Sequence, residues 1–147
     1  MVRGARAMLE ALALSGCELS ILLTGDAQIA ALNRVYRRKN RPTDVLAFAQ
    51  REGEHGDRSG PLLGDVVLSV ETARRQAHAR GATLASELTM LLAHGLLHLV
   101  GWDHDTPSKD RRMRRETDRL TAAAQAAEKP RAPKPRAGRP DPRPGRA

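Results

Sequence analysis

The chain has 147 residues and a formal net charge of +8, from 25 lysines and arginines against 17 acidic residues. This length suits one domain with a real core. Aromatic residues make up only 2% of the chain, which argues against RNA-binding modules that stack bases on several exposed rings. The single cysteine cannot form an intrachain disulfide, and no apolar run reaches the roughly 18 residues of a membrane span. We therefore expect a cytoplasmic protein with no membrane partner.

The N-terminal part predicts a helix followed by a strand. Residues 3–14 have helical composition, and Gly16 is expected to end this helix. From Cys17 to Leu23 apolar residues alternate with mostly polar ones, a period of two that is typical of a strand.

A second helix and a dense group of cations follow. Asp26 is placed to cap this helix, and Pro42 is expected to end it. Its apolar face carries Ile29, Leu32 and Tyr36. The cations lie toward its C-terminal end and are Arg34, Arg37, Arg38, Lys39 and Arg41.

The second half of the chain predicts two strands and three helices. The expected strands are 45–49 and 63–70, with a polar, glycine-rich loop over 52–60 between them. The expected helices are 71–80 ended by Gly81, 84–100 capped by Thr83, and 107–127 capped by Thr106. The second of these is apolar around most of its circumference, which is typical of a buried central helix. We therefore predict an α+β fold, a small mixed β-sheet with helices packed around a central helix.

The composition changes after residue 128. The segment 129–147 holds seven basic residues, one acid and six of the nine prolines, so it carries +6 and leaves +2 for residues 1–128. Such a segment cannot bury enough apolar surface to offset its ordering entropy. We expect a folded domain at 1–128 and a disordered basic tail at 129–147. The tail is either an electrostatic arm for nucleic acid or solvated chain with no specific role.

Three of the five histidines fall in the run HGLLHLVGWDH at 94–104. His94 and His98 lie one helical turn apart on the central helix, and Gly101 allows a turn that brings His104 back toward them. Three neutral imidazoles can bind Zn²⁺ and leave its fourth position to water, as in catalytic zinc sites. The alternative, two core histidines and one surface histidine, leaves polar rings on a leucine-rich helix at roughly 1–3 kcal/mol each. We therefore predict one zinc ion held by His94, His98 and His104.

The spacing of these histidines is metzincin-like, with one departure. Metzincin proteases place a glutamate directly after the first histidine, where it acts as general base. Here that position is Gly95, and no other acid lies in the helical part of the motif. The departure disfavours peptide hydrolysis. Asp103 and Asp105 either orient a ligand imidazole or lie at the surface.

The cations near the end of the second helix suit phosphate. Guanidinium groups bind phosphate in a fixed fork and stabilise the negative charge of a transition state. Cations at a helix C-terminus also suit the helix dipole, so a solvated helix end is the alternative.

Together these residues resemble a known family. The run HGLLHLVGWDH resembles the signature of the YbeY family of bacterial endoribonucleases, also called rRNA maturation factors. The resemblance extends to LNRVYRRKNRPTDVLAFA at 32–49 and LGDVVLS at 63–69, in the family's order, and covers roughly residues 19–120. The sequence departs from the family at Ala47, Ala49 and Trp102, where the family has Ser, Pro and Tyr.

The resemblance implies an α+β fold around one zinc ion, with His94, His98 and His104 as ligands and Arg37 as a functionally important arginine. It implies single-strand-specific RNA cleavage in maturation of the 3′ end of 16S rRNA and in late-stage ribosome quality control. The implied partners are single-stranded RNA and the small ribosomal subunit, without a nucleotide cofactor.

Three functions stay open at the level of the residues. The first is a metal-dependent endoribonuclease, in which either an activated water or the 2′-hydroxyl of the RNA attacks and Arg37 steadies the phosphate charge. The second is a metalloprotease-type hydrolase, against which Gly95 argues. The third is a non-enzymatic ribosome-assembly factor that binds RNA and uses zinc only to hold its fold.

Overall fold

The computed structural model describes residues 1–50 and 62–130. In that part the chain forms five helices and three strands, which confirms the α+β prediction. Their order is α1 (Val2–Ala11), β1 (Glu18–Thr24), α2 (Asp26–Arg37), β2 (Val45–Ala49), β3 (Leu62–Ser69), α3 (Val70–Arg80), α4 (Leu84–Leu99) and α5 (Pro107–Glu128). The expected loop 52–60 and the tail from residue 131 onward lie outside the described residues. None of the helices in the described ranges is long and apolar enough to cross a membrane.

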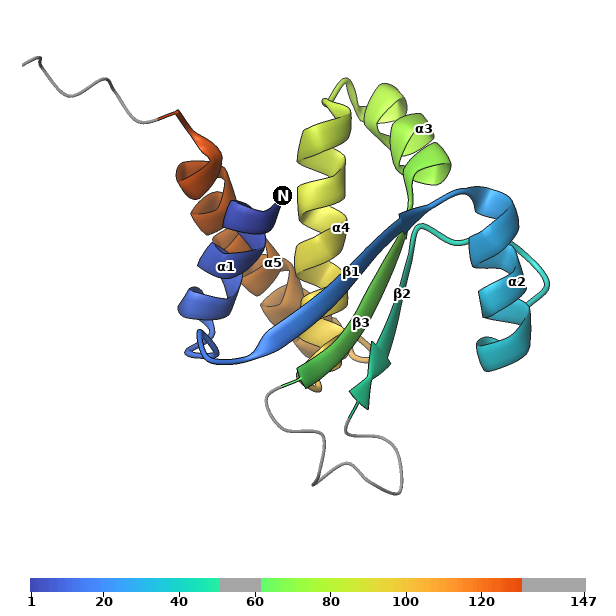
Figure 1. The fold of residues 1–147 in the computed structure, drawn as a ribbon, viewed down its shortest axis with the longest axis horizontal. Coiled ribbons are helices and arrows are strands. Elements are labelled where there is room, and N and C mark those ends of the chain that lie inside the picture. Colours follow the sequence, from blue (N-terminus) through green and yellow to red (C-terminus); the bar gives the residue numbers. More distant parts are fainter. Residues whose placement is uncertain (51–61, 131–147) are drawn as a thin grey trace, which may run out of the picture.

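The three strands form one mixed sheet with the order β1-β3-β2. β1 runs parallel to the central strand β3, and β2 runs antiparallel to it. Successive residues of β3 face opposite sides: Val66 and Leu68 pack in the large core cluster with α4, whereas Val67 packs with Ile29 of α2. The sheet therefore separates α4 from α2, as Figure 1 shows.

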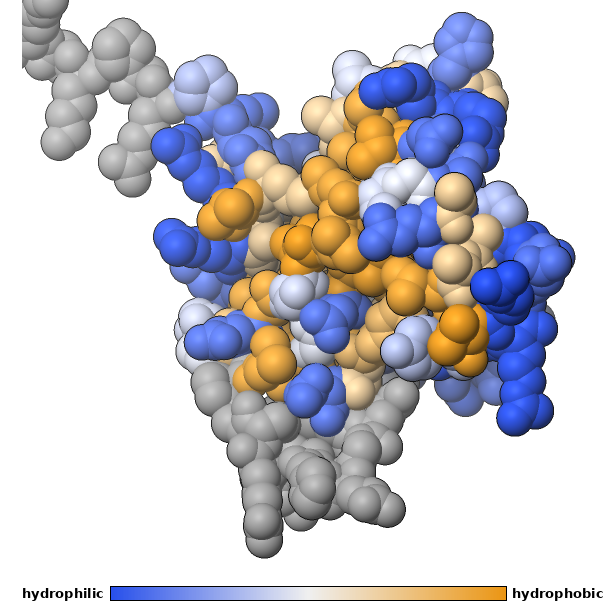
Figure 2. All heavy atoms as spheres, turned by 45° about the vertical axis from the view of Figure 1, so that its right-hand side comes forward, coloured by the Kyte–Doolittle hydropathy of each residue, from blue (hydrophilic) through white to orange (hydrophobic). Residues whose placement is uncertain are grey.

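The outer strand β1 leaves apolar surface exposed. Leu22 and Leu23 are exposed by 44% and 46%, although the alternation predicts that Leu23 faces the core. The reason is that β1 lies at the edge of the described sheet and pairs only with β3 there. Figure 2 shows hydrophobic side chains across the middle of one face of the molecule.

The core gathers around α4. The Thr83 side chain accepts a hydrogen bond from Ser86 N at 3.1 Å and begins the helix as predicted. α4 packs against β2 and β3 on one side and against α3 and α5 on the other, and α1 lies beside α5 (Figure 1). The buried residues of α4 are Glu87, Leu88, Leu91, Leu92, Ala93, Gly95, Leu96 and Leu97. This confirms the prediction of a buried central helix.

Gly95 sets the distance between α4 and the sheet. A Cβ at this position would lie 2.7 Å from Val66 Cγ1 and 3.0 Å from Val45 Cγ2, closer than van der Waals contact allows. The missing side chain therefore brings the last turns of α4 directly against β2 and β3.

Two helix ends differ from the prediction. α1 ends at Ala11, three residues earlier than expected, and the chain turns at Ala13 with φ +58° instead of at Gly16. α2 ends at Arg37, and Arg38 adopts a left-handed conformation with φ +57°. This ends the helix before Pro42 is reached, so part of the expected cationic helix end is loop.

Asp26 does not cap α2 as expected. The N-cap is Gly25, and Asp26 is the first residue of the helix. Its carboxylate instead accepts hydrogen bonds from Ser69 Oγ and Thr72 Oγ1, each at 2.6 Å. These hydroxyls, with an ion pair from Arg75 at 2.8 Å, lower the pKa of Asp26 to about 2. Asp26 thus joins the start of α2 to the start of α3.

Candidate metal centre

The C-terminal end of α4 and the turn after it bring the three predicted histidines together. His94 and His98 project from consecutive turns, and Gly101, with φ +94°, turns the chain so that His104 returns to them. The ring centroids are 4.6 Å apart for His94 and His98, 5.8 Å for His94 and His104, and 5.5 Å for His98 and His104. One ligand nitrogen from each ring lies within 4.8 Å of the other two.

The geometry of these nitrogens fits a single divalent ion. Nε2 of His94 and Nε2 of His98 face each other at 3.0 Å. Two ligands at about 2.0–2.1 Å from a tetrahedral zinc ion lie roughly 3.3–3.4 Å apart. When both nitrogens carry lone pairs they repel each other, and a bound cation would give both a partner. His94, His98 and His104 could therefore hold a metal ion.

The surroundings favour the neutral imidazoles that a metal requires. Burial, followed by the proximity of His98 and His104, lowers the pKa of His94, and the carboxylates of Asp44 and Asp110 oppose this only in part. Burial and His104 likewise lower the pKa of His98, against a hydrogen bond to the backbone of Trp102. Because protonated rings cannot bind metal, these lowered pKa values favour the neutral imidazoles that can act as ligands.

Among the described residues the histidine cluster includes no carboxylate. The Glu of the metzincin motif has no counterpart, because Gly95 faces the sheet and leaves no room even for a Cβ. Asp103 and Asp105 are exposed and form ion pairs with Lys109 at 3.5 and 3.3 Å. The general base that metzincins use therefore has no counterpart at position 95.

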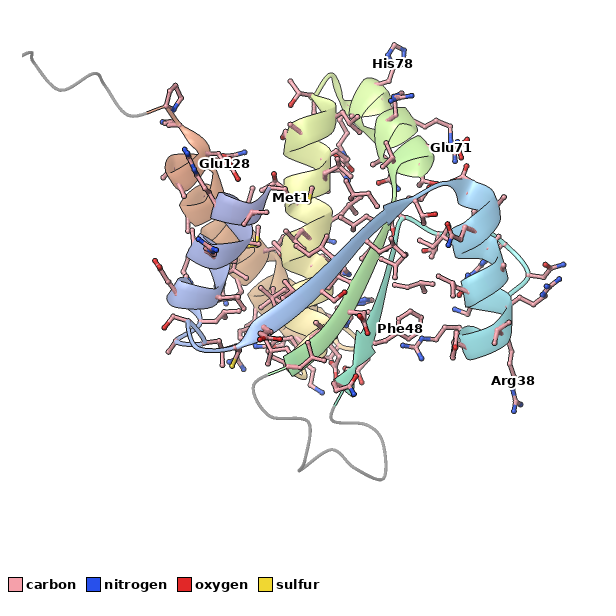
Figure 3. The ribbon with its side chains drawn as sticks, viewed as in Figure 1. Met1, Arg38, Phe48, Glu71, His78 and Glu128 are labelled. Carbon is pink, nitrogen blue, oxygen red and sulfur yellow. The ribbon has the colours of Figure 1, made fainter. Side chains whose placement is uncertain are left out.

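Arg37 lies at the end of α2 and contacts β2. Its Nη2 donates a hydrogen bond to Ala47 O at 2.7 Å, and its guanidinium carbon lies 5.1 Å from the centre of the Phe48 ring. Figure 3 shows Phe48 pointing from β2 toward α2. These two contacts hold the guanidinium plane in one orientation.

The structure divides the cationic group that the sequence suggested. Arg37, Lys39 and Arg41 line a hollow of about 670 Å³, which also includes Asp44. Arg38, in contrast, points away from the domain in Figure 3. The carboxylate of Asp44, which lines this hollow, also acts electrostatically on His94.

Sequence reasoning overlooked Asp44. Its carboxylate accepts hydrogen bonds from Val45 N at 2.8 Å and from Gln76 Nε2 at 3.2 Å. The second partner lies 32 residues away in the sequence, so no local pattern indicates it. Of the two remaining histidines, His78 lies at the outer end of α3 (Figure 3), and His55 lies outside the described residues.

Fold and site together define an α+β domain in which a buried helix and the turn after it bring three imidazoles together, a donor set that suits a metal ion. A family model for Endoribonuclease YbeY matches residues 3–125. The chain therefore belongs to the YbeY family.

Relatives support this assignment. The chain is 50% identical over 119 residues to Endoribonuclease YbeY of Anaeromyxobacter sp. strain Fw109-5, a match that covers 81% of this chain and 60% of the relative. It is 43% identical over 112 residues to Endoribonuclease YbeY of Geobacter metallireducens, covering 76% of this chain and 75% of the relative. The chain thus spans from about three fifths to three quarters of the length of these two relatives.

A solved structure shows the same fold. The solution structure of TM1509 from Thermotoga maritima matches with a TM-score of 0.59 and 20% sequence identity. The match covers 90% of this chain and 87% of the other chain.

Proposed function

We propose that this chain is a single-strand-specific, zinc-dependent endoribonuclease. It acts in late-stage ribosome quality control and in maturation of the 3′ end of 16S rRNA, and the small ribosomal subunit is its partner. The observation that carries the proposal is the convergence of His94, His98 and His104 within 4.8 Å in a chain related to endoribonucleases.

The donor set favours zinc. Three imidazoles without a carboxylate suit zinc better than magnesium or calcium, which prefer oxygen ligands. When bound, the ion polarises a phosphoryl oxygen and lowers the pKa of water. The missing general base at position 95 disfavours peptide hydrolysis. In RNA the 2′-hydroxyl can attack in place of water, and its proton would pass to a water or hydroxide whose pKa the bound ion lowers.

Arg37 is proposed to stabilise negative charge on the phosphate. Its contacts with Ala47 O and Phe48 fix the guanidinium, and its other N–H groups remain to donate to a phosphate oxygen. A donor held in place before the substrate arrives needs no reorganisation during the reaction, which is the basis of electrostatic catalysis. Lys39 and Arg41, on the same hollow, would attract the RNA backbone.

The direct test is cleavage of RNA by the purified full chain. A single-stranded RNA should be cut, a duplex of the same sequence should not, and a chelator should stop cleavage until Zn²⁺ is added back. Products ending in a 2′,3′-cyclic phosphate would indicate attack by the 2′-hydroxyl. RNA cleavage that continues in the presence of the chelator would refute the proposal. Cleavage of an unstructured protein with no effect on RNA would also refute it.

Two variants distinguish the role of the metal ligands from the role of Arg37. His98→Ala should lose bound zinc and cleavage while keeping most of its helical circular dichroism; global unfolding would instead indicate a purely structural metal. Arg37→Ala should lose at least about tenfold in cleavage rate and keep its zinc, because one charge-stabilising donor is worth this much or more. Arg38→Ala is the matched control, since its side chain points away from the domain (Figure 3). Equal activity of Arg37→Ala and Arg38→Ala would refute the role of Arg37.

A further inference from the structure

A cavity of about 540 Å³ opens beside the histidine centre, within the size range of small-ligand sites. It lies between the end of α4, the ends of β2 and β3, and the segment after α1. Its walls include Leu12, Leu14, Ala49, Leu63, His98 and Trp102. Of the described residues that line it, His98 is the one titratable side chain. The cavity is therefore an apolar space with a candidate metal ligand at its edge.

Trp102 borders this cavity and a second, basic hollow. Its backbone N donates to Leu97 O at 3.0 Å, which fixes the turn after α4, and its side chain packs against the core. The guanidinium of Arg112 lies 5.6 Å from the centre of the indole ring. Trp102 and Arg112 also line a smaller hollow of about 280 Å³, together with the ion-paired Lys109 and Asp103. The aromatic ring thus lies between an apolar cavity and a charged hollow in which Arg112 contacts the ring.

The apolar cavity suits the base of a nucleotide, and its charged surroundings suit the phosphate. A phosphate would lose its hydration among the leucines of the cavity without gaining a fixed cation there, so charge disfavours it. A nucleobase is flat and uncharged, and every base has a face that can stack on an aromatic ring. The phosphate of the same nucleotide would find positive charge outside the cavity, at a metal ion held by the histidines and at Arg112, whereas Lys109 is already paired with Asp103 and Asp105.

We infer that the cavity beside His98 binds one unpaired base of the RNA, with Trp102 as its stacking residue and the adjoining phosphate at the histidine centre. This rests on the proposed endoribonuclease function and deepens it. A base can enter the cavity only when it is out of a duplex, because a paired and stacked base is covered on both faces. The cavity therefore supplies a physical reason for single-strand specificity.

Tryptophan fluorescence can measure binding at this cavity, because Trp102 is the single tryptophan of the chain. The zinc-loaded full chain would be titrated with a single-stranded 2′-O-methyl oligonucleotide, which lacks the free 2′-hydroxyl. Three further probes would be an abasic strand of equal length and charge, a duplex, and inorganic phosphate. We expect saturable quenching of tryptophan fluorescence by the single strand alone. Equal quenching by the abasic strand, or no change with any probe, would overturn the inference.

Kinetics of two variants complete the test. Trp102→Leu should raise KM about 5- to 100-fold, the loss expected for one stacked base, with a smaller change in kcat. Trp102→Phe should recover most of this loss. Measurements of zinc content and thermal unfolding would check that both variants are folded. An unchanged KM in Trp102→Leu would overturn the inference and leave the proposed function standing. Base-dependent quenching without any RNA cleavage by the wild type would support the base site and refute the proposed endoribonuclease function.

Discussion

The contact between α4 and the sheet at Gly95 allows a quantitative test of the packing. In Gly95→Ala, the new methyl group would lie 2.7 Å from Cγ1 of Val66, which is fully buried, and 3.0 Å from Cγ2 of Val45, which packs against the core. Overpacking of this kind typically costs about 1–3 kcal/mol. Alanine is a better helix former than glycine by about 1 kcal/mol, which offsets part of the cost. Because 2.7 Å is far inside van der Waals contact, the upper part of that range applies, and we expect a net loss of about 1–2 kcal/mol.

Urea denaturation followed by circular dichroism measures this loss. Gly16→Ala is the control, because a Cβ there meets nothing within 4 Å; it should change the free energy of unfolding by no more than about 0.5 kcal/mol. Val66→Ala removes the atom that the new methyl group meets. The double variant Gly95→Ala/Val66→Ala should therefore be more stable than the sum of the single changes by roughly 1 kcal/mol. A Gly95→Ala variant as stable as the wild type would refute this account of the packing.

Three further outcomes are expected. Asp26→Asn should lower the free energy of unfolding at pH 7 by about 1–2 kcal/mol, a value reduced for the 23% exposure of the Asp26 side chain. Because the pKa of Asp26 is lowered to about 2 in the folded state, its stabilisation is present above pH 4 and lost as the pH falls toward 2. An Asp26→Asn profile as steep as that of the wild type in acid would contradict this. Thr106→Ala removes the side-chain cap that accepts a hydrogen bond from Lys109 N at 3.2 Å. It should lower the free energy of unfolding, measured by urea denaturation, by about 1 kcal/mol. An unchanged midpoint would show that the cap contributes nothing. Added Zn²⁺ should raise the melting temperature of the wild type and of His78→Ala but not of His98→Ala, because only a ligand that binds the folded state stabilises it; an equal rise in all three would place the ion elsewhere.

Local features of the sequence predicted most helices and strands within a few residues. Thr83 and Thr106 cap their helices through their own side chains, as their positions before apolar or proline residues indicate. Gly81 and Gly101 adopt the positive φ that was expected at helix ends. The spacing of His94 and His98 likewise needs only the period of one helix to place both on one face.

Features that depend on distant partners escaped prediction. Asp26 is a plausible cap by position, but Ser69 and Thr72, 43 and 46 residues away, provide hydrogen-bond donors for its carboxylate. Arg37 and Arg38 are adjacent and chemically identical, yet one is held against β2 and the other points into solvent, because α2 ends between them.

Residue type and the 3.6-residue period of a helix are enough to predict which residues can form a metal centre and which helix carries two of them. The surroundings of that centre depend instead on how distant segments pack. The approach of α4 to β2 and β3 at Gly95 leaves no room for an acid there, and the cavity lined by Trp102 combines residues from α4 and the ends of β2 and β3. These contacts join segments far apart along the chain, and packing density, which no local pattern contains, determines where such segments meet.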